Sequence, residues 1–244
     1  MQRAVRLVAQ SGAIDVEEML EAVEFVERVR RRVRRSHMLD LAAGHGLVGL
    51  LLLAVNPQVQ SVTFVDRAMP ASFESLYAAL ASDPSLGVNL DRVTYFQCDV
   101  HELASAVETS SQSRNPWAAQ RTPVVIEDVE QLAGQLLLWG RGNALGVVAV
   151  HACGALTDSV LVLASLAQAP VAVMPCCYSG TARGTPQAWR RSLGVAMAAD
   201  MRRSYGLWDA GYECVDFSAV PRAITPANRI IVASSRQQQQ QQQR

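Results

Sequence analysis

Short apolar runs alternate with longer helical patterns along most of the chain. The runs at 146–150 and 171–174 are continuously apolar, as is typical of strands buried on both faces of a parallel sheet. Shorter runs at 38–40, 62–65 and 93–96 each end at or near an acidic residue. Strands separated by helices in this order predict a mostly parallel sheet built from strand–helix–strand units.

The segments between these runs place apolar residues three or four positions apart, which predicts helices. Helices are expected at 16–35, 47–55, 72–81 and 156–167, and again from Trp189 to Met201. Two final strands, at 212–220 and 229–234, follow each other without a helix, so an antiparallel pair should close the sheet. The expected fold class is therefore α/β and Rossmann-like, with helices on both faces of the sheet.

The length of 244 residues suits one large domain with a small appendage. We expect an N-terminal helical segment at 1–35, a main domain at 36–235 and a disordered glutamine-rich tail at 236–244. The polar stretch at 109–122 interrupts the alternation and predicts a surface insertion.

Half of the residues are hydrophobic, which fits a globular domain with a large core. No apolar run approaches the roughly 20 residues that cross a bilayer, and no signal peptide is recognisable. The odd number of cysteines, five, favours reduced thiols over a disulfide framework. A cytoplasmic protein without membrane contact is the expectation.

The formal net charge is zero, so no global positive field indicates a nucleic-acid partner. All basic residues are arginines, and they are concentrated between Arg28 and Arg35 at the end of the first expected helix. Cations at a helix C-terminus are favoured by the helix dipole, so a solvated face explains this run. Contact with a polyanion such as RNA is the alternative.

Acidic and glycine residues gather where three expected strands end. Asp40 precedes Gly44 and Gly46 at a strand-to-helix turn, Asp66 ends the second strand, and Asp99 follows the third. Carboxyl ends of parallel strands meet at one edge of the sheet, where a nucleoside binds and an acid accepts hydrogen bonds from ribose hydroxyls. The set predicts a nucleoside pocket, although each acid taken alone would also serve as a helix cap.

The segment from Gly44 to Gly49 also matches the G-x-G-x-x-G pattern of dinucleotide-binding proteins. An NAD-dependent oxidoreductase is therefore an alternative. A carboxylate at Asp40 disfavours a pyrophosphate and suits the cationic methionyl end of S-adenosylmethionine.

The segment Asp40-x-Ala42-x-Gly44-x-Gly46 resembles the first motif of class I S-adenosylmethionine-dependent methyltransferases, with Ala42 in place of their usual first glycine. His151-Ala-Cys-Gly and Pro175-Cys-Cys-Tyr178 resemble two further segments of a methyltransferase family that includes tRNA ribose 2′-O-methyltransferases and methyltransferase-like proteins of uncertain substrate. The resemblance covers roughly residues 36–235. It implies a seven-stranded class I sheet and S-adenosyl-L-methionine as cofactor.

The cofactor site implied by this resemblance consists of the loop, the strand-end acids and the residues next to two of those acids. Its members are Asp40, Ala42, Gly44, Gly46, Asp66, Arg67, Asp99 and Val100. Tyr178 and Ser179 stand where the tRNA enzymes carry histidines, and no zinc-binding module precedes the domain. RNA is the leading expectation for the methyl acceptor. A catalytically silent cofactor-binding or scaffold domain remains an alternative.

His151 is the candidate catalytic residue, because imidazole can take a proton near neutral pH and methyl transfer to oxygen or nitrogen often needs a base. A purely structural hydrogen-bonded histidine is the alternative. Cys153, Cys176 and Cys177 should lie near it. Their spacing is not a usual zinc pattern, so no metal is expected and the cysteines are interpreted as packing residues.

Overall fold

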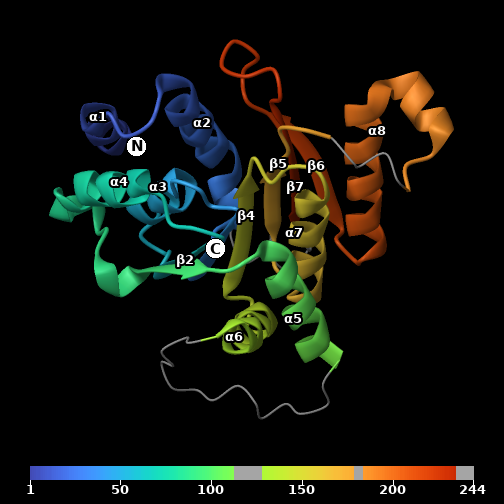
Figure 1. Cartoon of the computed structure of the whole chain (residues 1–244), viewed down its shortest axis with the longest axis horizontal. Coiled ribbons are helices and arrows are strands. Elements are labelled where there is room, and N and C mark those ends of the chain that lie inside the picture. The colour runs from blue at the N-terminus through green and yellow to red at the C-terminus, as the bar shows by residue number, and fades with distance from the viewer. Residues whose placement is uncertain (113–127, 179–183, 235–244) are drawn as a thin grey trace.

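The computed structural model describes residues 1–112, 128–178 and 184–234. A seven-stranded sheet with the order β3-β2-β1-β4-β5-β7-β6 runs through its middle (Figure 1). The strands are β1 (His37–Leu41), β2 (Ser61–Asp66), β3 (Val93–Gln97), β4 (Leu145–Val150), β5 (Val171–Met174), β6 (Cys214–Ala219) and β7 (Arg229–Ser234).

The first five strands pair in parallel, whereas β7 is antiparallel to both β5 and β6. The sheet reverses here because the link between β6 and β7 is too short for a crossover helix. The expected α/β fold class, with a mostly parallel seven-stranded sheet and an antiparallel end, is confirmed.

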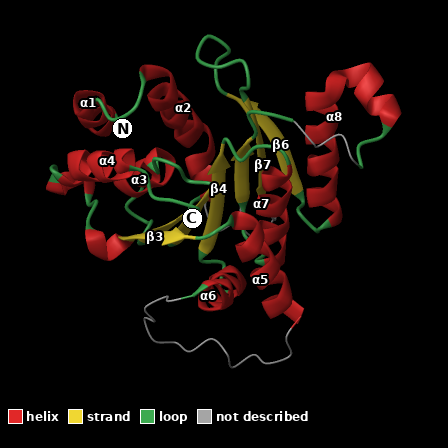
Figure 2. Ribbon diagram, in the orientation of Figure 1, coloured by secondary structure: helices red, strands yellow, loops and turns green. Residues whose placement is uncertain are grey.

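Helices form a layer on each side of the sheet (Figure 2). One layer holds α1 (Gln2–Ser11), α2 (Val16–Val33), α3 (Leu47–Val55) and α4 (Ala71–Ala81). The other holds α5 (Val100–Gln112), α6 (Val129–Arg141), α7 (Ala155–Leu166) and α8 (Gln187–Asp209). Two short 3-10 turns, Pro84–Leu86 and Leu90–Arg92, precede β3.

Alternate residues of the central strands enter opposite cores. Met38 and Val148 join the core beneath α2 and α3, while Leu39 and Val147 join the core beneath α5 to α7. Successive strand side chains point to opposite faces, so continuous apolar runs are needed to fill both cores.

The helix expected at 16–35 begins on Asp15, whose carboxylate accepts a hydrogen bond from Glu18 N at 2.8 Å. It ends at Val33, because Arg34 already has extended backbone angles. Phe25, Val26, Val29 and Val33 are fully buried against the sheet.

Three helices were not expected: α1, α5 and α6. Residues 109–112 of the expected insertion continue α5, and the remainder, like the glutamine-rich tail, lies outside the described residues. Within α8, Gly194 has a φ of 77° and kinks the helix. Among the described residues, no helix is long and apolar enough to cross a membrane.

Candidate functional site

The loop between β1 and α3 is built from backbone in the left-handed region. Ala42, Gly44 and Gly46 have φ values of 54°, 50° and 69°. A Cβ on Gly46 would lie 2.6 Å from the Phe73 ring, so glycine is required there on two grounds. A Cβ on Gly44 would meet nothing within 4 Å. The loop is therefore closely packed against Phe73 at Gly46, whereas the space beside Gly44 is open.

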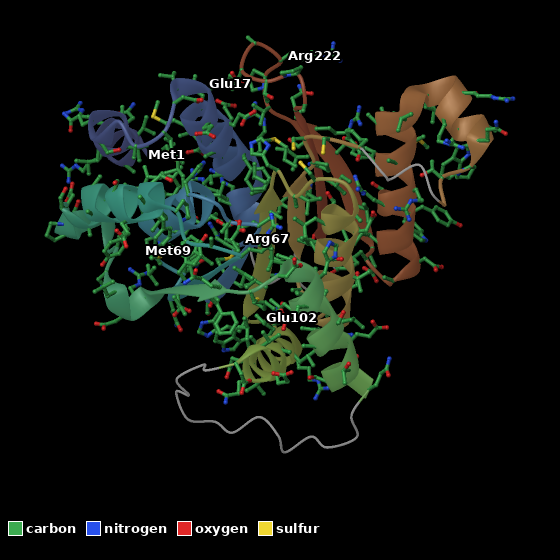
Figure 3. The ribbon with its side chains drawn as sticks, in the orientation of Figure 1. Met1, Glu17, Arg67, Met69, Glu102 and Arg222 are labelled. Atoms are coloured by element: carbon green, nitrogen blue, oxygen red, sulfur yellow. The ribbon has the colours of Figure 1, made fainter. Side chains whose placement is uncertain are left out.

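Asp66 joins this loop to the end of β2. Its carboxylate accepts a hydrogen bond from Gly44 N at 2.9 Å and another from Arg67 N at 2.7 Å. A carboxylate has about four lone-pair positions, so both oxygens can still accept a hydroxyl. Arg67 itself is exposed on the segment between β2 and α4 (Figure 3).

Asp40 is almost fully buried, and its carboxyl accepts a hydrogen bond from Gly49 N at 2.9 Å. Gly49 lies in the first turn of α3, where backbone N–H groups lack helical partners, so Asp40 caps that helix. Burial raises the pKa of Asp40 to about 8, and the nearby Asp66 adds to the rise. In the absence of a cation, the negative charge expected at this position is therefore disfavoured at neutral pH.

Asp99 caps the start of α5 by accepting a hydrogen bond from His101 N at 2.7 Å. The side chain of Val100 is buried in the core beneath this helix. Any contact between Val100 and a ligand is therefore restricted to its backbone. The carboxylate of Asp99 is only partly buried, so it remains accessible at the sheet edge.

Tyr95, on β3, was not expected in the site. Its hydroxyl lies 3.0 Å from Gly44 O and 3.1 Å from Ala68 O, which connects the glycine loop to the segment after β2. Burial raises its pKa, so the phenol stays protonated as a donor. Its ring packs edge-on against Phe73 at 4.7 Å. The alternation of side chains along a strand predicts a buried aromatic ring at Tyr95. It does not predict which groups the Tyr95 hydroxyl contacts.

His151 follows β4, and its Nε2 lies 2.8 Å from Glu21 Oε2. The Glu21 side chain is 6% exposed and that of His151 is 43% exposed, so a buried carboxylate holds an accessible imidazole. Glu21 was missed from the sequence. The available signal was an acid on the buried face of α2, four residues before Phe25 and eight before Val29.

His45, in the glycine loop, lies within electrostatic range of His151 and Glu18. Its Nδ1 accepts a hydrogen bond from Leu47 N at 3.1 Å, and burial lowers its pKa. His45 therefore serves as a neutral acceptor that holds the first turn of α3. The N-terminal helix α2, the glycine loop and the end of β4 thus meet at one place.

Three cysteines gather beside His151. The Sγ atoms of Cys153, Cys176 and Cys177 all lie within 4.8 Å of one another. Burial raises the pKa of Cys153 to about 12, and its two neighbouring thiols contribute. The expectation that these residues approach each other and His151 agrees with this arrangement, since Cys176 Sγ is 4.0 Å from His151 O.

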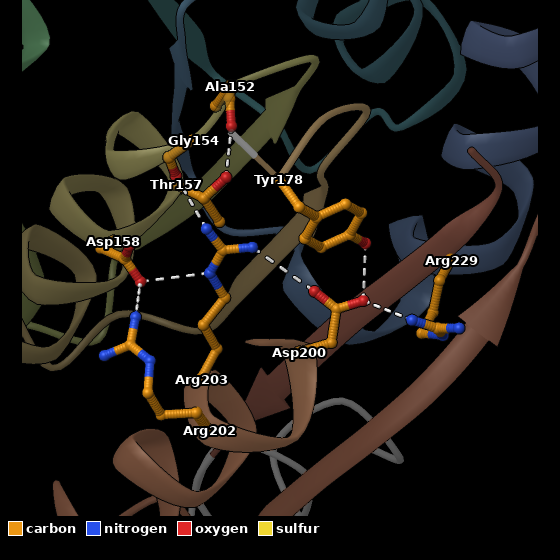
Figure 4. Close-up of polar contacts among 9 residues, drawn as sticks. All are labelled: Ala152, Gly154, Thr157, Asp158, Tyr178, Asp200, Arg202, Arg203 and Arg229. Carbon is orange, nitrogen blue, oxygen red and sulfur yellow. Dashed lines mark hydrogen bonds and ion pairs between the residues drawn. The ribbon is translucent and has the colours of Figure 1, made fainter. Parts of the chain in front are cut away.

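A network of ion pairs and hydrogen bonds contacts the segments that follow β4 and β5, which also carry the three cysteines (Figure 4). The carboxylate of Asp200 contacts Tyr178 Oη at 2.7 Å, Arg229 Nη1 at 2.6 Å and Arg203 Nη1 at 3.4 Å. Arg203 also donates to Gly154 O at 2.7 Å and pairs with Asp158 at 3.1 Å. The network fixes the segments after β4 and β5 to α8 and β7.

Comparison of the sequence with models of protein families identifies the family of this chain. A family model described as a methyltransferase domain matches residues 13–183, well over half of the chain. The chain belongs to this family of methyltransferase domains. No curated protein matches the sequence at a significant level.

Solved structures similar to this methyltransferase domain share little sequence with it. An O-methyltransferase family protein from Burkholderia thailandensis is 15% identical, with a TM-score of 0.43 over 90% of this chain and 55% of that one. A putative O-methyltransferase from Nostoc punctiforme is 15% identical, with a TM-score of 0.40 over 89% and 56%. A putative S-adenosylmethionine-dependent methyltransferase from Methanococcus maripaludis is 14% identical, with a TM-score of 0.40 over 92% of each chain. The chain spans about half the length of the first two.

The arginine run between Arg28 and Arg35 is largely occupied by internal contacts. Arg30 pairs with Glu27 at 3.0 Å and Arg32 with Asp216 at 2.8 Å. Arg28 contacts Glu24 and Ala219 O.

Arg35 is buried, which lowers its pKa to about 10, and donates to Asn143. Among described residues, the side chains of Arg31 and Arg34 make no hydrogen bond or ion pair.

Proposed function

We propose that this protein is an S-adenosylmethionine-dependent methyltransferase whose cofactor lies on the loop from Ala42 to Gly46. The observation that carries the proposal is the Asp66 carboxylate, held beside the open face of Gly44 by two backbone N–H groups. Membership of the methyltransferase family supports it. The same loop would fit a dinucleotide, and that alternative has no comparable family support.

The residues present fit this cofactor. Asp66 retains lone pairs for ribose hydroxyls, and the open space above Gly44 admits a ligand close to the backbone. Asp99 and the backbone of Val100 are available for the adenine edge. Bound S-adenosylmethionine would supply a methyl group activated by a sulfonium charge. Asp40 lies close enough to Asp66 for their charges to interact, and a nearby cation would favour its ionised form.

His151 acts as the general base in this proposal, and Glu21 is its positioning residue. With Nε2–H donating to the Glu21 carboxylate at 2.8 Å, the Nδ1 atom is left unprotonated. Nδ1 can then accept a proton from a hydroxyl or amine of the acceptor. A buried carboxylate that fixes the histidine tautomer is the arrangement used in other base-catalysed sites.

RNA is the acceptor that we propose to test first, and Arg31 and Arg34 are the arginines available for phosphate contact. Other members of the run already hold carboxylates or carbonyl groups. Incorporation of a labelled methyl group into separated RNA, protein and small-molecule fractions would identify the acceptor class. Labelling of protein or small molecules alone would exclude RNA.

Ligand preference tests the central claim. Isothermal titration calorimetry should detect binding of S-adenosylhomocysteine and no binding of NAD at the same concentration. Binding of NAD without any response to S-adenosylhomocysteine would overturn the assignment and favour an oxidoreductase.

The base assignment is tested separately. His151→Ala should reduce kcat by about 10²–10⁴-fold, the usual contribution of a general base, with S-adenosylhomocysteine affinity unchanged. Glu21→Gln should lower kcat less and alter the pH profile, because an amide holds the imidazole but does not stabilise its cation. Unchanged rates and pH profiles in both variants would assign the pair a structural role. His101→Ala, on the exposed face of α5, is the matched control.

A further inference from the structure

The structure also brings three thiols together from two separate segments. Cys153 lies after β4, and Cys176 and Cys177 lie after β5, with all three Sγ atoms within 4.8 Å of one another. The spacing of these cysteines along the chain is not a usual zinc pattern, so the sequence predicted no metal. However, Cys176 and Cys177 lie beyond the end of β5 at Met174, and both of their sulfurs come within 4.8 Å of the Cys153 sulfur.

We propose that Cys153, Cys176 and Cys177 bind a zinc ion. Thiolates are preferred ligands of zinc, with Zn–S distances of about 2.3 Å, which separates neighbouring sulfurs by roughly 3.8 Å. The three Sγ atoms, within 4.8 Å of one another, exceed this separation by about 1 Å at most. The cysteines are exposed or half-buried, so an ion can enter from solvent.

The backbone around the three thiols is held in place before any ion binds. His151 N donates to Met174 O at 3.0 Å, and Gly154 N donates to Cys177 O at 3.3 Å, so the two segments are joined directly. Arg203, whose side chain is 1% exposed, fixes Gly154 O from the other side. Preorganised ligands of this kind lower the entropic cost of binding an ion.

The ligand count indicates the type of site. Within the described part of the chain, no fourth cysteine, histidine or carboxylate belongs to this group. Three protein ligands with one exchangeable position are typical of catalytic zinc, whereas structural sites have four. The fourth position would therefore be occupied by water or by a group of a bound molecule, next to the residue that follows β4, His151.

Cobalt substitution provides the test. The full chain, stripped of metal under reducing conditions, should bind one equivalent of Co²⁺ with thiolate charge-transfer absorption and the visible bands of a tetrahedral ion, and Zn²⁺ should displace it. Cys153→Ser, Cys176→Ser and Cys177→Ser should each lower zinc affinity by about tenfold or more. Cys214→Ser, on β6, is the matched control and should bind zinc normally.

A cobalt spectrum without thiolate absorption, or zinc affinity unchanged in all three variants, would overturn the proposal. If a variant does not fold, alkylation of the wild-type chain replaces it. Zinc should then protect Cys153, Cys176 and Cys177 from iodoacetamide but leave Cys214 reactive, and equal labelling with and without zinc would overturn the site. An added small thiol should shift the cobalt spectrum, and a spectrum that does not respond would contradict the open position. None of these measurements depends on S-adenosylmethionine binding.

Discussion

The sheet edge at the carboxyl ends of the parallel strands has two halves that are built in different ways. Around β1, β2 and β3, acids accept hydrogen bonds from backbone N–H groups, of which the most distant in sequence is Gly44 N, 22 residues from Asp66. Asp40 binds Gly49, nine residues away, and Asp99 binds His101, two residues away. Around β4 and β5, side chains from distant segments bind one another, as Glu21 does with His151 across 130 residues.

This difference predicts that substitutions in the two halves will change different properties of the protein. Backbone contacts in the first half leave carboxylate lone pairs beside an open loop, whereas the second half contains, next to the accessible His151, a network of buried ion pairs. Asp200 and Arg203 have side chains 0% and 1% exposed, so each ion depends on the other for compensation. Substitution of Asp66 should therefore affect ligand affinity most, and substitution in the buried ion pairs around Asp200 should affect stability most.

The largest effect is expected at Asp200. Asp200→Ala leaves the buried Arg203 without one of its compensating charges, which should lower the free energy of unfolding by about 3–5 kcal/mol. Urea denaturation followed by circular dichroism measures it. Asp216→Ala, which removes an acid 55% exposed from its pair with Arg32, should cost only about 0–1 kcal/mol. Equal losses in the two variants would contradict the division.

Asp66→Ala should weaken S-adenosylhomocysteine binding by about 1–3 kcal/mol, because hydrogen bonds to a charged group are lost. The free energy of unfolding should fall by less than in Asp200→Ala. Calorimetric titration of Asp66→Ala beside Asp91→Ala, an exposed acid before β3, separates ligand contact from general charge effects. Wild-type affinity in Asp66→Ala would remove this residue from the site.

Asp40 predicts a pH dependence of stability. Its pKa rises from the ordinary value of 3.8 to about 8 on folding, so the unfolded chain releases its proton first. This contribution to stability is fully present below about pH 4 and is lost as the pH rises towards 8. Asp40→Asn should flatten the decline between pH 5 and pH 8 by about 1.4 kcal/mol per pH unit, since one unit of pKa shift is worth roughly 1.4 kcal/mol. An unchanged slope in urea denaturation would show that Asp40 is ionised in the folded state.

The smallest effect is expected at Ala42, whose φ of 54° lies where a Cβ is disfavoured. Ala42→Gly should raise the free energy of unfolding by about 0.5–1 kcal/mol. This gain is the cost of holding alanine in the left-handed region, which the change removes, minus the additional backbone entropy that glycine loses on folding. Ala78→Gly, in the exposed part of α4, should instead lower it by about 1 kcal/mol. Destabilisation by both changes would mean that the Ala42 methyl group makes a compensating contact.

Much of the fold followed from the sequence because hydrophobic periodicity is a local property. The strands β1, β2, β4 and β5 were expected within a residue or two, since continuous apolar runs can only be satisfied between two layers. Helices α5 and α6 were missed because they flank the polar segment that was interpreted as an insertion. Helix α1 has only two buried residues, Ala4 and Val8, so its apolar pattern is weak.

The sequence by itself predicted which edge of the sheet carries Asp40, Asp66 and Asp99, because these acids stand at or just after the ends of successive expected strands. Only the tertiary structure decided that Glu21 holds His151, that the sulfurs of Cys153, Cys176 and Cys177 come within 4.8 Å of one another, and that the buried carboxyl of Asp40 caps α3. No periodic pattern of residues along the chain predicts which of these segments will contact one another. Their pairing is fixed by the packing of α2, α7 and α8 on the sheet, and burial in that packing sets their charges.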